Sequence, residues 1–448
     1  MQKTAWFTIL ICSVCLEGLG RRYLPFIPQA AFYFLKDAIL LFGWLQFRPS
    51  GEMRQTIRSL YGGFDKILII AFVWTVAEVF NPQQQSFVLA LIGLRSYWLW
   101  WIAPGIIAMA LRDTRDKDRA IYGLLILVAI VSGFAVIQFA SPPDSSANMY
   151  AVWNGEEVYS AGNAIVESTG RARVASTFAF VTGFVDFTML VPALLLSLGL
   201  DSSSVKVRQA ALVGTMMASA VVPMSGSRAS VVIGVAILLL ALWSAGLFFT
   251  RAGRRILIGG VVASVLAVVA FPDALTGVQS RFEENPDETN SRFEGITNLL
   301  PPVAIARFDY PALGVGTGMQ QNGRAAFHIT TEWDTEPEVG RYLVELGPFG
   351  FVLMWTAKLG LMVALMRSYK ILKRAGRRGS SAAALAYAAL TMVGALTFDH
   401  CWQALYFIGC GFILSEVVAV NRQRTIADGR ALVRRVETGD LAPSYGAT

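Results

Sequence analysis

The amino-acid sequence predicts an all-α polytopic membrane protein with about twelve transmembrane helices. Apolar residues make up 54% of the 448 residues and charged residues only 15%, which is far from the composition of a soluble protein. The apolar residues fall into runs of about 16 to 26, long enough to cross a hydrocarbon core of ~30 Å as helices. A membrane β-barrel would instead show short segments of alternating polarity. We therefore treat residues 1–448 as a single membrane domain.

The hydropathy pattern gives the positions of the expected helices. In chain order the candidate spans cover residues 5–20, 28–47, 67–82, 86–111, 120–140, 177–200, 209–224, 229–249, 256–271, 342–366, 381–398 and 403–420. The first run follows only Lys3, contains Glu17 and lacks a small-residue cleavage site. We therefore interpret it as a retained helix and not as a cleaved signal peptide.

The distribution of lysine and arginine predicts the orientation in the membrane. Placing Met1 in the cytoplasm makes inside segments of residues 48–66, 112–119, 201–208, 250–255, 367–380 and 421–448. These segments and Lys3 hold 25 of the 38 basic residues, as expected for cytoplasmic loops. Both termini are then cytoplasmic, residues 421–448 form a cytoplasmic tail, and the net charge of +7 reflects stop-transfer flanks. A nucleic-acid partner is not expected.

Two loops on the predicted outer side are much longer than helix connections usually are. They cover residues 141–176 and 272–341, and we expect function to reside there. The larger loop, between the ninth and tenth spans, is predicted to be partly helical. It contains the glycine-rich stretch GVGTGMQQNG at 314–323, whose backbone can turn tightly and expose N–H groups. The chain has no nucleotide-binding P-loop motif.

Cysteine and histidine give little sign of a metal or redox site. Cys12 and Cys15 lie within the first span, where buried apolar thiols are favoured over a redox pair. Only two histidines are present and they do not cluster with cysteine, so no zinc site and no cofactor are predicted.

Charges inside the spans are the more informative residues, because the membrane makes them costly. Arg228, in the sequence SGSRAS, and Arg95 are expected to be functional. Ion pairing and function remain open for four further charges, Lys36, Asp37, Asp186 and Lys358. Asp399 and His400 meet the outer surface at the last hairpin, where capping or an interfacial role is favoured.

The acidic stretch DTEPEVGRYLVELGPFG, residues 334–350, joins the larger loop to the next span. It combines four carboxylates with Arg341 at a membrane surface; they belong to Asp334, Glu336, Glu338 and Glu345.

Several of these features together resemble the O-antigen ligase and O-antigen polymerase superfamily. They are the twelve-span layout, the SGSR sequence at an outer helix end, the large arginine-containing loop, its GVGTG turn and the ELGPFG end of the acidic stretch. The resemblance is strongest over residues 171–350. It implies a GT-C-like membrane fold and an inverting, metal-independent glycosyltransferase that uses undecaprenyl-diphosphate-linked donors outside the bacterial inner membrane.

The resemblance also implies which residues bind the donor. A guanidinium stays charged and grips phosphate oxygens bidentately, so arginines suit a departing diphosphate. The expected diphosphate-binding residues are Arg228, Arg171, Arg173, Arg292, Arg341 and Arg95. For Arg171 and Arg173, a role as solvated loop charges remains open.

The sequence departs from the family pattern at the catalytic base. Family ligases carry a histidine before a G-x-x-G sequence, and Gly347 and Gly350 match the latter. The histidine position holds Glu336, while His328 lies eight residues too early. A carboxylate can act as general base if its surroundings raise its pKa, so the candidate catalytic residues are Glu336, Glu338 and His328. The alternative is that the acidic run only solvates the loop.

The missing histidine favours a polymerase of exopolysaccharide or O-antigen repeat units over a ligase that joins glycan to lipid A-core. Transfer to protein is a third possibility within the same fold. The expected partners are the lipid-linked glycan donor, a glycan or lipid A-core acceptor and membrane lipids. A transporter or flippase of lipid-linked saccharides is the alternative class, although it would favour midplane binding residues and internal repeats. A structural scaffold protein would give no reason for the position of Arg228.

Overall fold

The computed structural model describes residues 3–24, 26–148, 170–248, 300–321 and 337–437, with short pieces at 152–153, 156–157 and 165–166 and single residues elsewhere. The described chain is almost entirely helical, as predicted. Its elements are α1 (Lys3–Cys15), α2 (Glu17–Tyr23), α3 (Gln29–Gln46), α4 (Gly51–Tyr61), α5 (Phe64–Ala77), η1 (Glu78–Phe80), α6 (Phe87–Trp98), η2 (Leu99–Ile102), α7 (Ala103–Ala110), α8 (Thr114–Ala140), β1 (Val152–Trp153), β2 (Glu156–Glu157), β3 (Ile165–Val166), β4 (Arg171–Ala172), α9 (Val181–Asp201), α10 (Val205–Ala220), η4 (Val222–Ser225), α11 (Arg228–Ser244), α15 (Pro301–Arg307), α16 (Glu338–Arg374), α17 (Arg378–Val393) and α18 (His400–Glu437).

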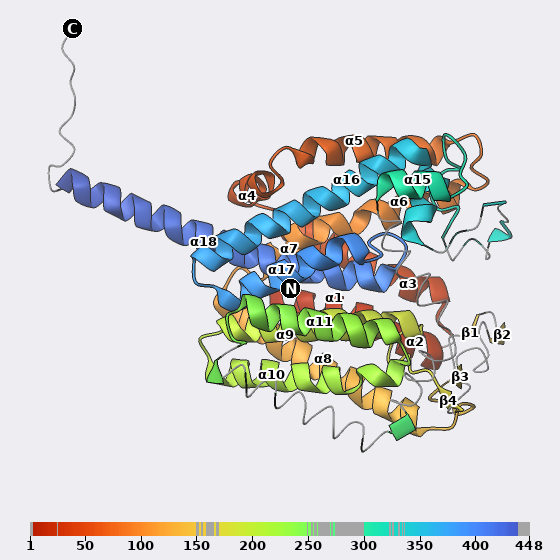
Figure 1. Cartoon of the computed structure of the whole chain (residues 1–448), viewed down its shortest axis with the longest axis horizontal. Helices are drawn as coiled ribbons and strands as arrows, with labels where there is room; N and C mark the ends of the chain where they lie inside the picture. The colour runs from red at the N-terminus through yellow and green to blue at the C-terminus, as the bar shows by residue number, and fades with distance from the viewer. Residues whose placement is uncertain are drawn as a thin grey trace, which may run out of the picture.

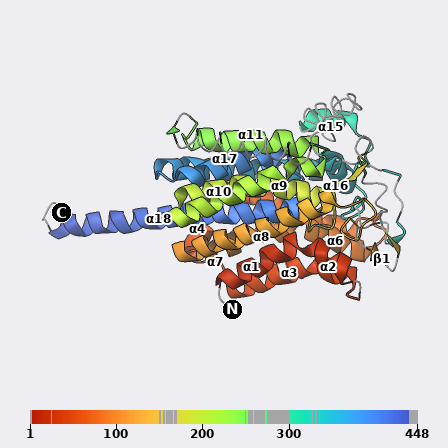
Figure 2. The same cartoon turned by 90° about the horizontal axis from the view of Figure 1, so that it is seen from below.

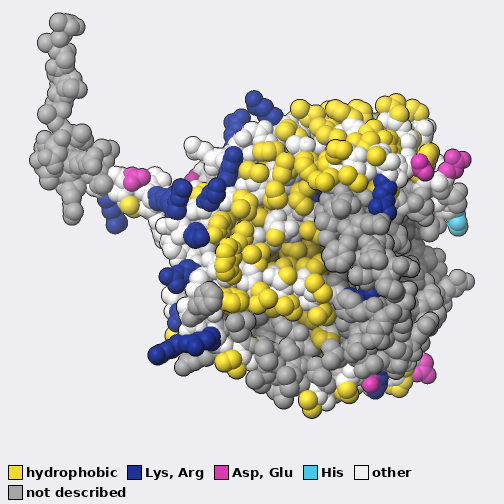
Figure 3. Space-filling model, in the orientation of Figure 1, with side chains coloured by type: hydrophobic (Ala, Val, Ile, Leu, Met, Phe, Trp, Pro, Cys, Tyr) yellow, Lys and Arg dark blue, Asp and Glu magenta, His cyan; other side chains and the backbone are white. Residues whose placement is uncertain are grey.

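The long helices lie side by side in one bundle (Figures 1 and 2). The antiparallel hairpins β1–β2 and β3–β4 and the short helix α15 lie at one end, which we call the loop end. The last helix, α18, projects from the opposite end (Figure 1). Lys and Arg side chains gather mostly around that opposite end, and hydrophobic side chains cover the adjoining flank (Figure 3). We call it the basic end.

The helices support a multi-pass membrane protein. Within the described residues six helices are long and apolar enough to cross a membrane, or up to eight if each of two bent pairs is one span. The pairs are α1 with α2, bent by 60°, and α3 with α4, bent by 117°. The predicted span 67–82 corresponds to α5, whose 14 residues rise only ~21 Å and fall short of the membrane core.

The predicted count of twelve spans therefore stays a prediction. The range 256–271 lies almost entirely outside the described residues. At the C-terminus the predicted tail, residues 421–448, begins as a continuation of α18, which extends to Glu437. Arginines follow the span there, and arginine is a good helix former that can continue a helix into water.

The core of the bundle forms around α18 and α9. In their most apolar windows 94% of α18 and 83% of α9 are buried within the protein. Large aromatic side chains fill the space between helices, among them Trp6 of α1, Trp100 of η2 and Phe412 of α18, each at most 1% exposed. Because this part of α18 is surrounded by protein on most sides, its residues 404–414, ALYFIGCGFIL, are apolar on every face of the helix.

Residues 338–350 of the acidic stretch form the first turns of α16, which contain a break at Gly347. This glycine has φ 67° and ψ 177°, a conformation open essentially to glycine alone, and Pro348 follows it. The break brings the backbone close to the glycine-rich turn, because the N–H of Gly316 donates to the carbonyl of Glu345 at 3.1 Å. A Cβ on Gly314 would lie 2.4 Å from that same carbonyl oxygen.

The Glu345 side chain fastens the glycine-rich turn from inside. It is completely buried and accepts hydrogen bonds from the N–H of Gln320 at 2.6 Å and from the hydroxyl of Tyr97 at 2.9 Å. On the other side of the turn, Thr317 donates to the carbonyl of Ala90 in α6. The turn is thus a fixed part of the bundle, held between α6 and α16.

We expect Gly347→Ala to lower stability more than Gly246→Ala does. A Cβ at Gly347 would lie 2.7 Å from the carbonyl oxygen of Ala312, whereas at Gly246, with a φ of 69°, it would meet nothing within 4 Å. The strained backbone costs about 1 kcal/mol at Gly246, and the closed region and steric overlap raise the cost at Gly347 to about 3 kcal/mol. Thermal unfolding of the two variants in detergent measures the difference, and equal melting temperatures would contradict it.

Candidate functional site

A tight turn precedes α11 at the loop end of the bundle. It is built by Ser225, Gly226 and Ser227, with Gly226 at a φ of 62°. The Ser227 side chain accepts a hydrogen bond from the N–H of Ser230 and so caps the helix. Arg228 is the first residue of α11 and is only 7% exposed. A buried arginine is therefore the first residue of a 17-residue helix, whose first N–H groups have no partner within the helix.

The segment after the second hairpin brings Arg173 to this turn, and Arg171 precedes it by two residues in the hairpin. Nε of Arg173 donates to the carbonyl of Ser225 at 3.4 Å. Arg171, in β4, forms an ion pair with Asp273 at 3.1 Å and is partly exposed. We call Arg171, Arg173 and Arg228 the arginine site. Three of the predicted diphosphate-binding residues thus lie in one region of the loop end.

Buried contacts hold the backbone that carries Arg173. Arg22 of α2 donates to the carbonyls of Ser176 at 2.8 Å and Phe178 at 2.7 Å. A Cβ on Gly18 would lie 2.0 Å from the carbonyl carbon of Phe178, so the absence of a side chain lets α2 approach this segment. The position of the arginine site is therefore set by the first two helices as well as by α11.

The chemistry of the arginine site favours the binding of an anionic ligand. Guanidinium groups make charge-assisted hydrogen bonds to phosphate, and the first N–H groups of a helix favour negative charge. Two guanidiniums beside one helix start suit a ligand with two adjacent negative groups better than a single carboxylate.

A second set of charges lies inside the bundle between α2, α3 and α6. Nζ of Lys36 lies 2.6 Å from Glu17, which also pairs with Arg21. Asp37 pairs with Arg95 at 2.5 Å. We call these five residues the buried charge network. Of the two roles left open for Lys36 and Asp37, the structure supports ion pairing.

Arg95, one of the predicted diphosphate-binding residues, is ion-paired inside the bundle. Its guanidinium is tied to Asp37 and donates to the Tyr33 hydroxyl at 2.8 Å, and it lies 4.5 Å from the centre of the Tyr33 ring. These contacts explain how the charge is tolerated inside the bundle without a ligand. Arg95 therefore belongs to the buried charge network, and its diphosphate-binding role stays a prediction.

A hydrogen bond links the start of α18 to the buried charge network. The Tyr33 hydroxyl hydrogen-bonds to Nε2 of His400, the first residue of the helix. Asp399 caps the helix, because its Oδ1 accepts from the N–H groups of Cys401 at 3.0 Å and Trp402 at 3.1 Å. The favoured capping role of Asp399 is thus confirmed.

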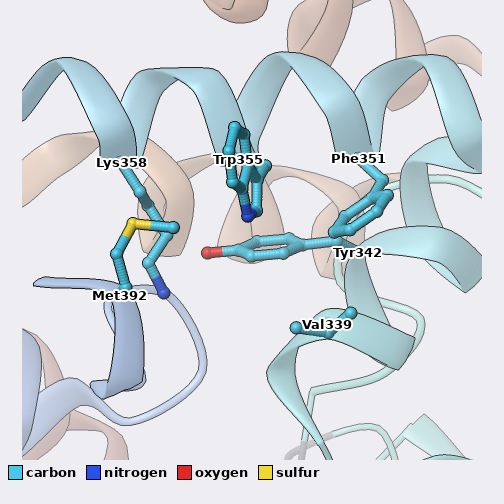
Figure 4. A pocket seen from close by; sticks show the side chains of 6 residues that line it. All are labelled: Val339, Tyr342, Phe351, Trp355, Lys358 and Met392. Atoms are coloured by element: carbon cyan, nitrogen blue, oxygen red, sulfur yellow. The ribbon is translucent and has the colours of Figure 1, made fainter. Parts of the chain in front are cut away.

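Glu338, a candidate base, forms an ion pair in the structure. Its carboxylate lies 2.6 Å from Nζ of Lys358, which follows 20 residues later in α16, beyond the break at Gly347. It also accepts a hydrogen bond from the N–H of Thr397 at 2.8 Å. Lys358 also donates to the carbonyl of Gly394 at 3.0 Å. Beside this pair lies a small, mainly apolar pocket (Figure 4), lined by Val339, Tyr342, Phe351, Trp355, Lys358 and Met392. Lys358, the open charge of the tenth span, is therefore ion-paired, as are Lys36 and Asp37 of the second span.

Four predicted site residues remain to be located, namely His328, Arg341, Glu336 and Arg292. His328 is exposed, with a left-handed φ of 55°. Arg341 lies 5.3 Å from the centre of the Phe398 ring, and its Nε donates to the carbonyl of Thr335. Glu336 and Arg292 lie outside the described residues. The structure thus gathers Arg171, Arg173 and Arg228, while these four stay separate predictions.

Sequence reasoning missed the partners of the intramembrane charges. Glu17 was noted only as an argument about the first span, and Tyr33 was not singled out. The spacing of Tyr33, Lys36 and Asp37 places them on adjoining faces of one helix, which is the signal that could have linked them. Glu345 carried no signal beyond its place in the acidic stretch.

Within the described ranges no group of three or more His, Cys, Asp or Glu residues is arranged to hold a metal ion. Comparison with protein-family models, with curated proteins and with solved structures finds no significant match for this chain.

We expect the Glu338–Lys358 pair to behave as a coupled unit in stability. Glu338→Gln leaves a buried cation without its partner and should cost about 3–5 kcal/mol, and Lys358→Met should cost a similar amount. The double variant removes both charges and should recover most of that loss. Thermal unfolding of the four proteins in detergent tests this, and additive losses in the double variant would disprove the coupling.

Proposed function

We propose that this chain transfers glycan from an undecaprenyl-diphosphate-linked donor to an acceptor hydroxyl at the loop end of the bundle. The observation that carries the proposal is the arginine site, where the buried Arg228 starts α11 and Arg173 reaches the same turn. The resemblance to the O-antigen ligase and polymerase superfamily supplies the identity of the donor.

The donor's chemistry matches the arginine site. A sugar diphosphate is already activated, so the enzyme must stabilise the charge that develops on the departing diphosphate and hold an acceptor hydroxyl near the anomeric carbon. Fixed guanidiniums and helix N–H groups meet the first need, and they act more strongly where protein and lipid exclude water. An inverting displacement follows if the hydroxyl attacks from the side opposite to the diphosphate.

The charge distribution supports an orientation with the loop end outside the bacterial inner membrane. Lys and Arg gather at the basic end (Figure 3), as cytoplasmic segments do. This orientation puts both termini in the cytoplasm and the arginine site on the side where lipid-linked glycans are joined. Donor and acceptor would then meet beneath the 272–341 loop.

Within this chemistry we favour a polymerase of exopolysaccharide or O-antigen repeat units over an O-antigen ligase. Glu336 takes the place where family ligases have histidine. A polymerase joins two lipid-linked saccharides, so an acceptor carried by the same kind of lipid would approach the same face of the bundle. Loss of the protein separates the cases, because lost polymerase leaves single repeat units and lost ligase leaves unattached polymer.

The ion pairing inside the bundle supports an enzyme over a transporter. A transporter of lipid-linked saccharides would need charges that are accessible near the membrane midplane. Lys36, Asp37 and Arg95 instead pair with neighbours inside the bundle, and the clustered arginines lie at its end.

We expect Arg228→Ala to abolish glycan product while the protein still accumulates in the membrane. Loss of one fixed donor to the leaving group should lower turnover by about 10²–10³-fold, and Arg228→Lys should restore only part because lysine cannot bind bidentately. Glycan is measured on gels from a deletion strain that carries each variant. The control is Arg58→Ala, since that side chain is 79% exposed in an ion pair with Asp65 at the basic end. Normal product with Arg228→Ala would refute the diphosphate role.

We also expect purified enzyme to keep its activity after treatment with a chelator, because arginines neutralise the diphosphate in this proposal. The measurement is turnover before and after chelation, with divalent ions added back as the control. Activity that falls with chelator and returns with a divalent ion would show that a metal takes part.

A further inference from the structure

We propose that Ser225 is a positioning residue of the arginine site. In this role it holds Arg173 and Arg228 at one spacing, so that the site binds a diphosphate in preference to a monophosphate. The inference rests on the proposed function and names the residue through which the two arginines act together. Ser225 is the last residue of η4 and is completely buried.

Two hydrogen bonds dock the segment that carries Arg173 onto the end of η4. Nε of Arg173 donates to the carbonyl of Ser225 at 3.4 Å, and the N–H of Val174 donates to the carbonyl of Met224 at 3.3 Å. Binding one N–H of a planar guanidinium fixes the direction in which its other donors point. The Ser225 carbonyl therefore sets both the position and the orientation of the Arg173 guanidinium.

The docked segment presents its arginines on one side. Burial alternates along residues 171–174, where Ala172 and Val174 are buried and Arg171 and Arg173 are half-buried. Successive side chains of an extended chain point to opposite faces. The buried contacts of Ala172 and Val174 therefore hold both arginines on the other face of this segment.

The hydroxyl of Ser225 holds the backbone that leads to Arg228. Its Oγ accepts a hydrogen bond from the N–H of Ser227 at 3.2 Å and donates to the carbonyl of Val222 at 2.8 Å. Ser227 is the N-cap residue of α11, and Arg228 follows it directly. Ser225 thus contacts the Arg173 side chain through its carbonyl and the start of α11 through its hydroxyl.

This double contact makes the hydroxyl important for the spacing of the two arginines. With alanine at position 225, the N–H of Ser227 loses its acceptor, so the turn has to shift to provide another. Because the carbonyl of the same residue holds Arg173, any such shift changes where Arg173 lies relative to Arg228.

A diphosphate is the ligand for which a fixed spacing matters. Its two phosphates are joined by one oxygen and stay close together, whereas a monophosphate can be held by one arginine alone. Each guanidinium makes charge-assisted hydrogen bonds to phosphate, and holding both in place beforehand removes the cost of ordering them on binding. Undecaprenyl diphosphate, the leaving group of the proposed reaction, has the second phosphate that undecaprenyl monophosphate lacks.

The experiment measures the affinity of purified wild-type protein, Ser225→Ala and Ser225→Cys for these two lipids. Affinity is taken from the rise in melting temperature with lipid concentration. In Ser225→Ala the affinity for undecaprenyl diphosphate should fall roughly tenfold or more, the effect of one lost charge-assisted hydrogen bond. The affinity for the monophosphate should stay close to wild type. Ser225→Cys should lose part of the preference, because a thiol is a weak acceptor.

A double-mutant cycle tests whether Ser225 acts through Arg173. Arg173→Ala should itself weaken binding of undecaprenyl diphosphate. Adding Ser225→Ala to that variant should cause little further loss, because the side chain that Ser225 positions is already gone.

The matched control is Ser415→Ala in α18. Ser415 is also buried, and its hydroxyl likewise donates to the carbonyl three residues earlier, that of Phe412 at 2.7 Å. This variant loses the same kind of hydrogen bond far from the arginine site. It should keep wild-type affinity for both lipids even if its melting temperature without lipid falls.

The outcomes separate this inference from the proposed function. A wild-type preference for the diphosphate in either Ser225 variant would overturn the positioning role, as would equal losses for the two lipids or additive losses in the double-mutant cycle. A wild-type protein that binds both lipids equally would also overturn it, while the glycan gels of Arg228→Ala still test the proposed function. If the wild-type protein binds neither lipid and its deletion leaves glycan unchanged, the proposed function fails and this inference falls with it.

Discussion

A charge inside a membrane protein must find its counter-charge within the protein, because neither lipid nor distant water can solvate it. This requirement organises the loop-end half of the bundle. Lys36, Asp37 and Arg95 come from two helices and are balanced by one another and by Glu17 of a third. The packing of α2, α3 and α6 is thus fixed by ion pairs as well as by apolar contacts, and those ion pairs leave the first helices in position to hold Arg173.

Backbone groups obey the same constraint, and this explains the acidic stretch. The break at Gly347 would leave N–H and C=O groups unsatisfied within the bundle. Backbone groups of the glycine-rich turn form hydrogen bonds with them. The buried carboxylate of Glu345 in turn accepts a hydrogen bond from an N–H group of the glycine-rich turn. Glycine is needed on both sides because the two backbones approach more closely than side chains allow. The acidic stretch resembles a catalytic signature, but its ELGPFG end has a structural role, because it packs the break in α16 against the glycine-rich turn.

The same constraint decides how acids inside the bundle are accommodated. Glu338 and Lys358 balance each other across the break in α16, and Asp37 is balanced in the same way by Arg95. Glu345 has no such cation as ion-pair partner among the described residues and is held by hydrogen bonds from the N–H of Gln320 and the hydroxyl of Tyr97. A buried carboxylate is thus accommodated either by an ion pair between helices or by hydrogen bonds from a fixed turn.

Composition and hydropathy by themselves determined that this is an all-α membrane protein, where most helices lie, and which end carries the basic residues. These properties depend on the local chain and on its partition between water and lipid. Only the tertiary structure decided which charges meet. Hydropathy marked Arg95, Arg228 and Asp186 as unusual, but their partners lie on other helices, at depths and faces that packing sets. For that reason the ion pair between Arg95 and Asp37 could not be read from the sequence.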